Sequence, residues 1–123
     1  MSIDDAIRHH EAGRLREAER TYRSILDSEP HDPDALHLLG VLLIQIGEYD
    51  GAVEHIQRAL EADRDSAPFQ SSLAQAYFRL GKFAEAVETQ KRAMAHGGAE
   101  DPDSRERLQR YEKAHSEHTK RSR

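Results

Sequence analysis

The chain has 123 residues, a size typical of one modest domain. Its 18 basic and 23 acidic residues give a formal net charge of −5, which argues against general nucleic-acid binding because phosphates require a Lys and Arg surplus. A mean hydropathy of −0.87 and the lack of an apolar run of about 20 residues exclude a transmembrane helix. The acidic N-terminus predicts no signal peptide, so we expect a cytoplasmic protein without a membrane partner.

Three residue types, Cys, Trp and Asn, are absent from the sequence. Without Cys, the chain has no disulfide, no thiolate nucleophile and no Cys-ligated zinc. Hydrophobic residues make up 37% and charged residues 33% of the chain, a balance that favours a thin helical structure over one deep core. This composition argues against a buried enzyme active site.

Similar residues recur every 34 positions, and the period divides the chain into three repeats at about 1–32, 33–66 and 67–100. One glycine stands at the same place in each repeat, at Gly13, Gly47 and Gly81. Small residues occupy two further columns, seven positions before and five positions after each glycine. These columns contain Ala6, Gly40 and Ala74, and Ala18, Ala52 and Ala86.

Each repeat is predicted to form two helices joined at its glycine, with the first helix of the first repeat short. In the second repeat, apolar spacing predicts helices over about 33–46 and 49–62, with Ile46 on the apolar stripe of the first. Asp32 is a candidate N-cap, and Pro33 suits a first helical turn. Gly47 supplies the turn between the two helices, because glycine adopts positive φ at no steric cost.

A further helix is predicted over about 102–117, after the cap-and-proline signal at Asp101 and Pro102. Its apolar stripe is sparse, as suits a terminal helix that covers the last repeat and keeps a polar outer face. Residues 119–123 are predicted to be a frayed tail, so the domain spans 1–118.

The second repeat resembles a tetratricopeptide repeat, and the first and third repeats match it in register. The resemblance covers about four-fifths of the chain. We therefore predict an all-α fold, a right-handed α-solenoid of three such helix–turn–helix repeats plus one capping helix. The residues of the second repeat that carry the resemblance are Leu36, Leu39, Gly40, Leu43, Gly47, Tyr49, Ala52, Ile56, Ala59 and Leu60.

The sequence offers little for catalysis, and we expect no enzyme activity and no cofactor. The glycines follow the repeat and form no phosphate-binding loop, and no zinc-protease motif is present. His115 and His118 are three residues apart and could chelate a metal ion, but no third ligand is fixed near them, so solvated histidines are the favoured interpretation.

The resemblance implies that the first helices of successive repeats line a concave groove that binds peptides. Among the off-core residues of these helices, Ile7, Val41, Ile44 and Phe78 are apolar and would form a contiguous patch, unless they support helix packing instead. The full set of candidate ligand-groove residues is Ile7, His10, His37, Val41, Ile44, Gln45, Ser71, Gln75, Phe78 and Arg79.

Chaperone-binding members of the family hold a C-terminal carboxylate with Lys, Arg and Asn side chains. The corresponding positions here are Ile3, Ile7, Leu38, Pro68 and Ser72, and the chain has no Asn, so we expect no carboxylate clamp. The favoured function is a non-catalytic interaction module that binds a peptide or helix of a partner protein in its groove.

Two alternatives remain open. Residues 1–66 hold 15 acidic and 7 basic residues, whereas 67–123 hold 8 acidic and 11 basic residues, so the chain could self-associate weakly as an assembly scaffold. The resemblance also permits a recruiting or regulatory portion of a larger bacterial enzyme.

Overall fold

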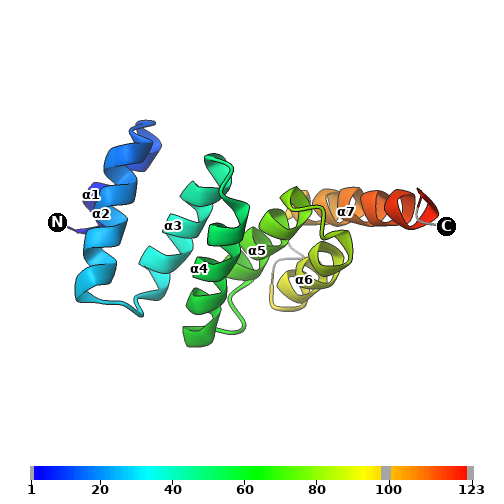
Figure 1. The fold of residues 1–123 in the computed structure, drawn as a ribbon. Coiled ribbons are helices and arrows are strands. Elements are labelled where there is room, and N and C mark those ends of the chain that lie inside the picture. Colours follow the sequence, from blue (N-terminus) through cyan, green and yellow to red (C-terminus); the bar gives the residue numbers. More distant parts are fainter. Residues whose placement is uncertain (1, 98–100, 122–123) are drawn as a thin grey trace. The chain divides into compact units, whose positions relative to one another are not determined.

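In a computed structural model that describes residues 2–97 and 101–121, the chain folds into α-helices and contains no described strand (Figure 1). The all-α prediction is confirmed, and the helices form three helix–turn–helix pairs followed by a further helix. No helix in these ranges is both long enough and apolar enough to cross a lipid bilayer. The helices are α1 (Ile3–Glu11), α2 (Leu15–Ser28), α3 (Pro33–Gln45), α4 (Tyr49–Ala62), α5 (Ala67–Arg79), α6 (Phe83–Ala95) and α7 (Pro102–Arg121).

The helices group into two compact units, an N-terminal unit over residues 1–63 and a C-terminal unit over residues 64–123. The N-terminal unit contains α1 to α4 and the C-terminal unit contains α5 to α7. The single domain expected over 1–118 stays a prediction.

Short polar caps mark the starts of α1 and α3, whereas α2, α4 and α6 begin without a side-chain cap. The Asp32 carboxylate accepts a hydrogen bond of 3.1 Å from the Ala35 backbone nitrogen, and Pro33 occupies the first turn of α3, as predicted. Ser2 and Asp5 form a reciprocal capping box at the start of α1. These caps satisfy backbone N–H groups that have no partner within the helix.

The predicted turns of the three repeats are confirmed. Gly13, Gly47 and Gly81 have φ values of 78°, 86° and 78°, within the left-handed region that a residue with a side chain rarely adopts. One glycine per repeat is therefore required by the backbone that reverses direction between the paired helices.

The small-residue columns lie where paired helices approach closely. In the N-terminal unit, Ala6, Ala18 and Ala52 are fully buried. A Cβ atom added at Gly40 of α3 would lie 2.4 Å from Ile56 Cγ1 of α4, so the backbones can come this close only because Gly40 has no side chain. The core of this unit is completed by the buried leucines of α3, which are Leu36, Leu39, Leu42 and Leu43.

The C-terminal unit has a smaller core in which α7 participates. Ala74 of α5, Ala86 of α6 and Tyr111 of α7 are buried together, and partly buried side chains that include Phe78 pack against them. Asp101 caps α7 by accepting a hydrogen bond of 3.1 Å from the Asp103 backbone nitrogen, as the sequence predicted.

Two helix ends differ from prediction. Helix α3 ends at Gln45, so Ile46 is its C-cap residue and is 42% exposed instead of joining the apolar stripe. Helix α7 continues past residue 117 to Arg121, so residues 119–121 are helical instead of frayed. Residues 122 and 123 lie outside the described ranges.

Candidate functional site

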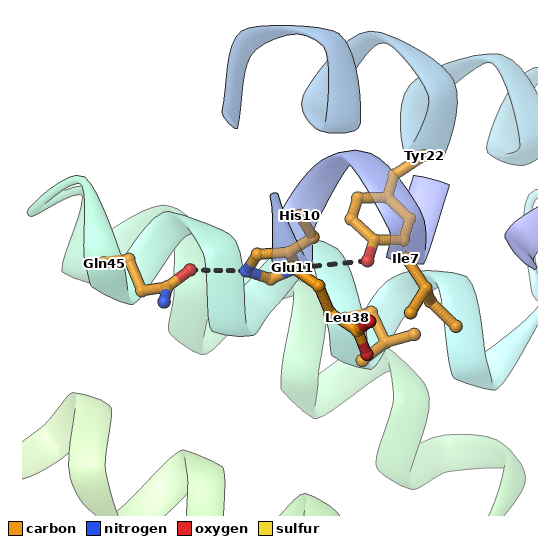
Figure 2. A pocket seen from close by; sticks show the side chains of 6 residues that line it. All are labelled: Ile7, His10, Glu11, Tyr22, Leu38 and Gln45. Carbon is orange, nitrogen blue, oxygen red and sulfur yellow. Dashed lines mark hydrogen bonds between the residues drawn. The ribbon is translucent and has the colours of Figure 1, made fainter. Parts of the chain in front are cut away.

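An open pocket of about 380 Å³ lies in the N-terminal unit between α1, α2 and α3 (Figure 2). Each of the three helices contributes at least one side chain to it. Its size falls within the range of small-molecule pockets but near the lower end, where one or two side chains of a partner fill the volume. The lining residues are Ile7, His10, Glu11, Tyr22, Leu38 and Gln45.

His10 of α1 connects the other two helices through its ring nitrogens. Its Nδ1 atom lies 3.1 Å from the Tyr22 hydroxyl of α2, and its Nε2 atom is hydrogen-bonded to Gln45 Oε1 of α3 (Figure 2). A carbonyl oxygen only accepts, so Nε2 carries the proton, and in the neutral ring Nδ1 accepts from the Tyr22 hydroxyl. The imidazole is therefore held in one tautomer and one orientation.

Tyr22 forms the buried side of the pocket. Its side chain is 0% exposed, and its ring meets the His10 ring edge-on with centroids 6.0 Å apart. Burial raises the pKa of Tyr22, and the nearby Glu11 carboxylate raises it further. The phenol therefore stays protonated at neutral pH and remains the donor to His10.

Glu11, at the end of α1, gives the pocket a negative charge. Its side chain is exposed and makes no hydrogen bond or ion pair within the described ranges. No Lys or Arg lines the pocket. The two arginines nearest in sequence have other partners, since Arg8 pairs with Asp5 and Arg14 Nε donates to His9 Nδ1 at 3.0 Å.

Ile7 and Leu38 supply the apolar part of the lining, from α1 and α3 respectively. Both side chains are half-buried, so their outer atoms remain available to a ligand. The pocket thus combines a small apolar surface with fixed polar groups and one free carboxylate.

A family model described as tetratricopeptide repeat matches residues 9–75 and 47–110. The chain belongs to the tetratricopeptide repeat family. A search of curated proteins found no match.

Solved structures that share the fold include MamA and two tetratricopeptide repeat (TPR) domains. The crystal structure of MamA is 25% identical, with a TM-score of 0.84 over 98% of this chain and 68% of that one. The first TPR domain of Spaghetti (RPAP3), bound to the HSP90 peptide SRMEEVD, is 18% identical, with a TM-score of 0.87 over 92% and 89% of the two chains. The Sgt2 TPR domain from Aspergillus fumigatus is also 18% identical, with a TM-score of 0.87 over 95% and 78%.

Three of the residues predicted to line the TPR groove, Ile7, His10 and Gln45, come together in the pocket. His37 and Val41 are half-buried on α3 and do not line it. Burial lowers the pKa of His37, and the Asp34 carboxylate partly opposes that effect.

The contiguous apolar patch expected over Ile7, Val41, Ile44 and Phe78 stays a prediction. Ile44 is buried, with 6% of its surface exposed, and the other three side chains are half-buried. Within the described ranges, the large hydrophobic side chain that is exposed is Ile46.

Two predicted groove residues of the third repeat are in contact with α7. Phe78 stacks on Tyr111 with ring centroids 4.8 Å apart, and Arg107 donates a hydrogen bond of 3.3 Å to the Ser71 hydroxyl. In this unit, Ser71 and Phe78 therefore support packing of the terminal helix. Gln75 and Arg79 are exposed on α5. The ligand-binding role of these four residues stays a prediction.

Three pocket residues, Glu11, Tyr22 and Leu38, were not among the predicted ligand residues. Glu11 could have been found, because it occupies the same repeat column as Gln45. Tyr22 could also have been found from the sequence. The equivalent residues of the other repeats are Ile56 and Gln90, which are buried, and a buried tyrosine hydroxyl requires a hydrogen-bond partner.

The structure offers no metal centre in residues 2–97 and 101–121, where no group of three or more His, Asp or Glu is arranged to hold an ion. The candidate ligand His118 has its ring against the edge of Phe83, with centroids 5.7 Å apart.

Proposed function

We propose that this TPR protein is a non-catalytic interaction module, and that its N-terminal pocket holds a side chain of a partner peptide. The observation that carries the proposal is the open pocket of about 380 Å³ on the first helices of the first two repeats. Three predicted groove residues line it, and the volume suits a side chain that anchors a longer segment.

The polar groups of the pocket favour binding over catalysis. Both ring nitrogens of His10 are occupied by hydrogen bonds to Tyr22 and Gln45, so the imidazole is not positioned as a general base. No Ser or Thr lies among the lining residues to serve as a nucleophile. A ring locked in this way instead offers a rigid surface, which reduces the entropy that binding costs.

The peptide is proposed to bind without a carboxylate clamp. The five positions that correspond to the clamp hold Ile3, Ile7, Leu38, Pro68 and Ser72, and none of these can pair with a carboxylate as Lys or Arg does. The Spaghetti (RPAP3) domain binds the acidic peptide SRMEEVD, and the exposed Glu11 would repel such a ligand here.

A random peptide display library, selected on the full chain, tests the proposal. The test variant is Leu38→Trp, because the indole ring is larger than the leucine side chain and fills the pocket. The matched control is Ile46→Trp, which adds the same ring at an exposed position outside the pocket. We expect enriched peptides to bind the wild type and the control, and to lose at least about tenfold in affinity for Leu38→Trp.

Circular dichroism of each variant first establishes that its helix content is unchanged. Peptides that bind all three proteins equally would place the peptide site elsewhere and contradict the proposal. A library that yields no specific peptide would contradict peptide binding itself.

A further inference from the structure

The chemistry of the pocket points to one class of ligand, and we propose that the side chain it accepts is a lysine or arginine. The inference rests on the proposed function and specifies its partner as a segment with a basic side chain flanked by apolar residues. Three independent features of the N-terminal unit support it: the free charge at the pocket, the polarity of its fixed groups and its apolar lining.

The unpaired charge at the pocket is the negative charge of the Glu11 carboxylate. This exposed carboxylate has no partner within the described ranges, and the neighbouring Arg8 and Arg14 are paired with Asp5 and His9. Its field reaches the buried side of the pocket, since it contributes to raising the pKa of Tyr22. A ligand ammonium or guanidinium group would neutralise this charge, whereas a ligand carboxylate would be repelled.

The fixed polar groups present acceptors to the ligand. His10 uses Nε2–H to donate to Gln45 Oε1, and its Nδ1 accepts a hydrogen bond from the Tyr22 hydroxyl. The Gln45 carbonyl oxygen retains a lone pair and the Glu11 carboxylate has all of its own, whereas the Tyr22 oxygen is buried behind His10 and does not meet the ligand. Lys and Arg have several N–H donors, which match the acceptors of Glu11 and Gln45.

The apolar lining fits the aliphatic part of such a side chain. Ile7 and Leu38 are half-buried and belong to the same pocket as Glu11. Lys and Arg commonly bury their methylene stems along apolar surface and keep the charged end near polar groups. A wholly apolar side chain would cover the acceptors without pairing them, at a cost in desolvation.

The charge of the whole unit acts in the same direction. Residues 1–63 contain 14 acidic and 6 basic side chains, a formal net charge of −8. This field attracts a basic segment at long range and accelerates its association at low salt.

Three blocked peptides of equal length, with leucines around a central Lys, norleucine or Glu, serve as probes. Each is titrated into the isotope-labelled full chain, and amide chemical shifts report where it binds. We expect the Lys peptide to shift amides of α1 and α3 and to bind more tightly than the norleucine peptide. The Glu peptide should bind most weakly.

The charge itself is tested with Glu11→Gln. Its matched control is Glu54→Gln, which removes the same charge from an exposed position of α4 that does not line the pocket. Because solvent-exposed ion pairs are weak, we expect Glu11→Gln to bind the Lys peptide about fivefold less tightly at low salt. Glu54→Gln should change the affinity by less than about twofold, and added salt should abolish most of the difference.

Equal affinity for the Lys and Glu peptides, or no effect of Glu11→Gln, would overturn the basic specificity. The proposed function would survive that result if the norleucine peptide still binds and Leu38→Trp still abolishes its binding. Shifts of the same α1 and α3 amides with protein concentration alone would assign the pocket to a second copy of the chain and overturn the inference. If none of the three peptides shifts the amides of α1 and α3, the inference of a basic ligand is also overturned. The proposed function is tested separately by the peptide display library.

Discussion

Gly40 shows how one missing side chain sets the distance between two helices. The equivalent residues of the other repeats are Ala6 and Ala74. Only Gly40 lies opposite a β-branched residue, Ile56, whose column otherwise holds Tyr22 and Gln90. A β-branched side chain has two γ atoms and cannot rotate both away from a neighbour, whereas a side chain with one γ atom can. The pair of Gly40 and Ile56 is therefore expected to be energetically coupled.

Gly40→Ala is predicted to destabilise the protein, although alanine is the better helix former. The helix propensity gain is about 1 kcal/mol. Overpacking against the fully buried Ile56 costs about 1–3 kcal/mol. We expect the free energy of unfolding to fall by about 1 kcal/mol, measured by urea denaturation.

Ile56→Leu supplies the second arm of a double-mutant cycle, because leucine keeps the volume and has a single γ atom. In that background, Gly40→Ala should be neutral or stabilising. If Gly40→Ala costs the same stability in both backgrounds, the close approach to Ile56 does not explain the glycine.

Helix α7 shows how an element outside the repeat period is held in place. Tyr111 is 2% exposed and belongs to the buried cluster with Ala74 and Ala86, and its ring stacks on Phe78. A second connection comes from Arg107, which donates to the Ser71 hydroxyl of α5. The aromatic contact buries more apolar surface, so it is expected to dominate the docking energy.

Tyr111→Ala is predicted to destabilise the C-terminal unit by about 3 kcal/mol, since truncating a buried aromatic leaves a large cavity. The control is Tyr111→Phe, which retains the ring and should cost less than about 1 kcal/mol. Thermal unfolding followed by circular dichroism measures both changes. Equal destabilisation by the two variants would mean that the hydroxyl, not the stacked ring, holds α7.

The repeat period predicted the helices of the second repeat closely, because a glycine, a cap and a regular apolar stripe mark its boundaries. It could not predict that α7 covers Ser71 and Phe78, since this helix has no counterpart in the repeat. The candidate site was predicted in part. Ile7, His10 and Gln45 were found as off-core residues, but the connection through Tyr22 depends on which side chains of α1, α2 and α3 converge.

At the scale of the whole molecule, burial is distributed unevenly along the chain. Helix α1 has nine residues and one buried side chain, Ala6, and α7 has two buried side chains, Ser104 and Tyr111. Helix α3 contains seven buried residues. In repeat proteins each element is stabilised by its neighbours, so terminal elements with little buried surface open first.

Native-state hydrogen exchange should therefore show the strongest amide protection in α3 and weaker protection in α1 and α7. The difference of several buried leucines corresponds to at least about 2 kcal/mol, or about 30-fold in protection factor. Tyr111→Ala should lower protection in α7 and leave α1 unchanged, because the two helices lie in different units. Equal protection of all helices, with a parallel loss in α1 and α7 on Tyr111→Ala, would instead show that the chain opens as one cooperative body.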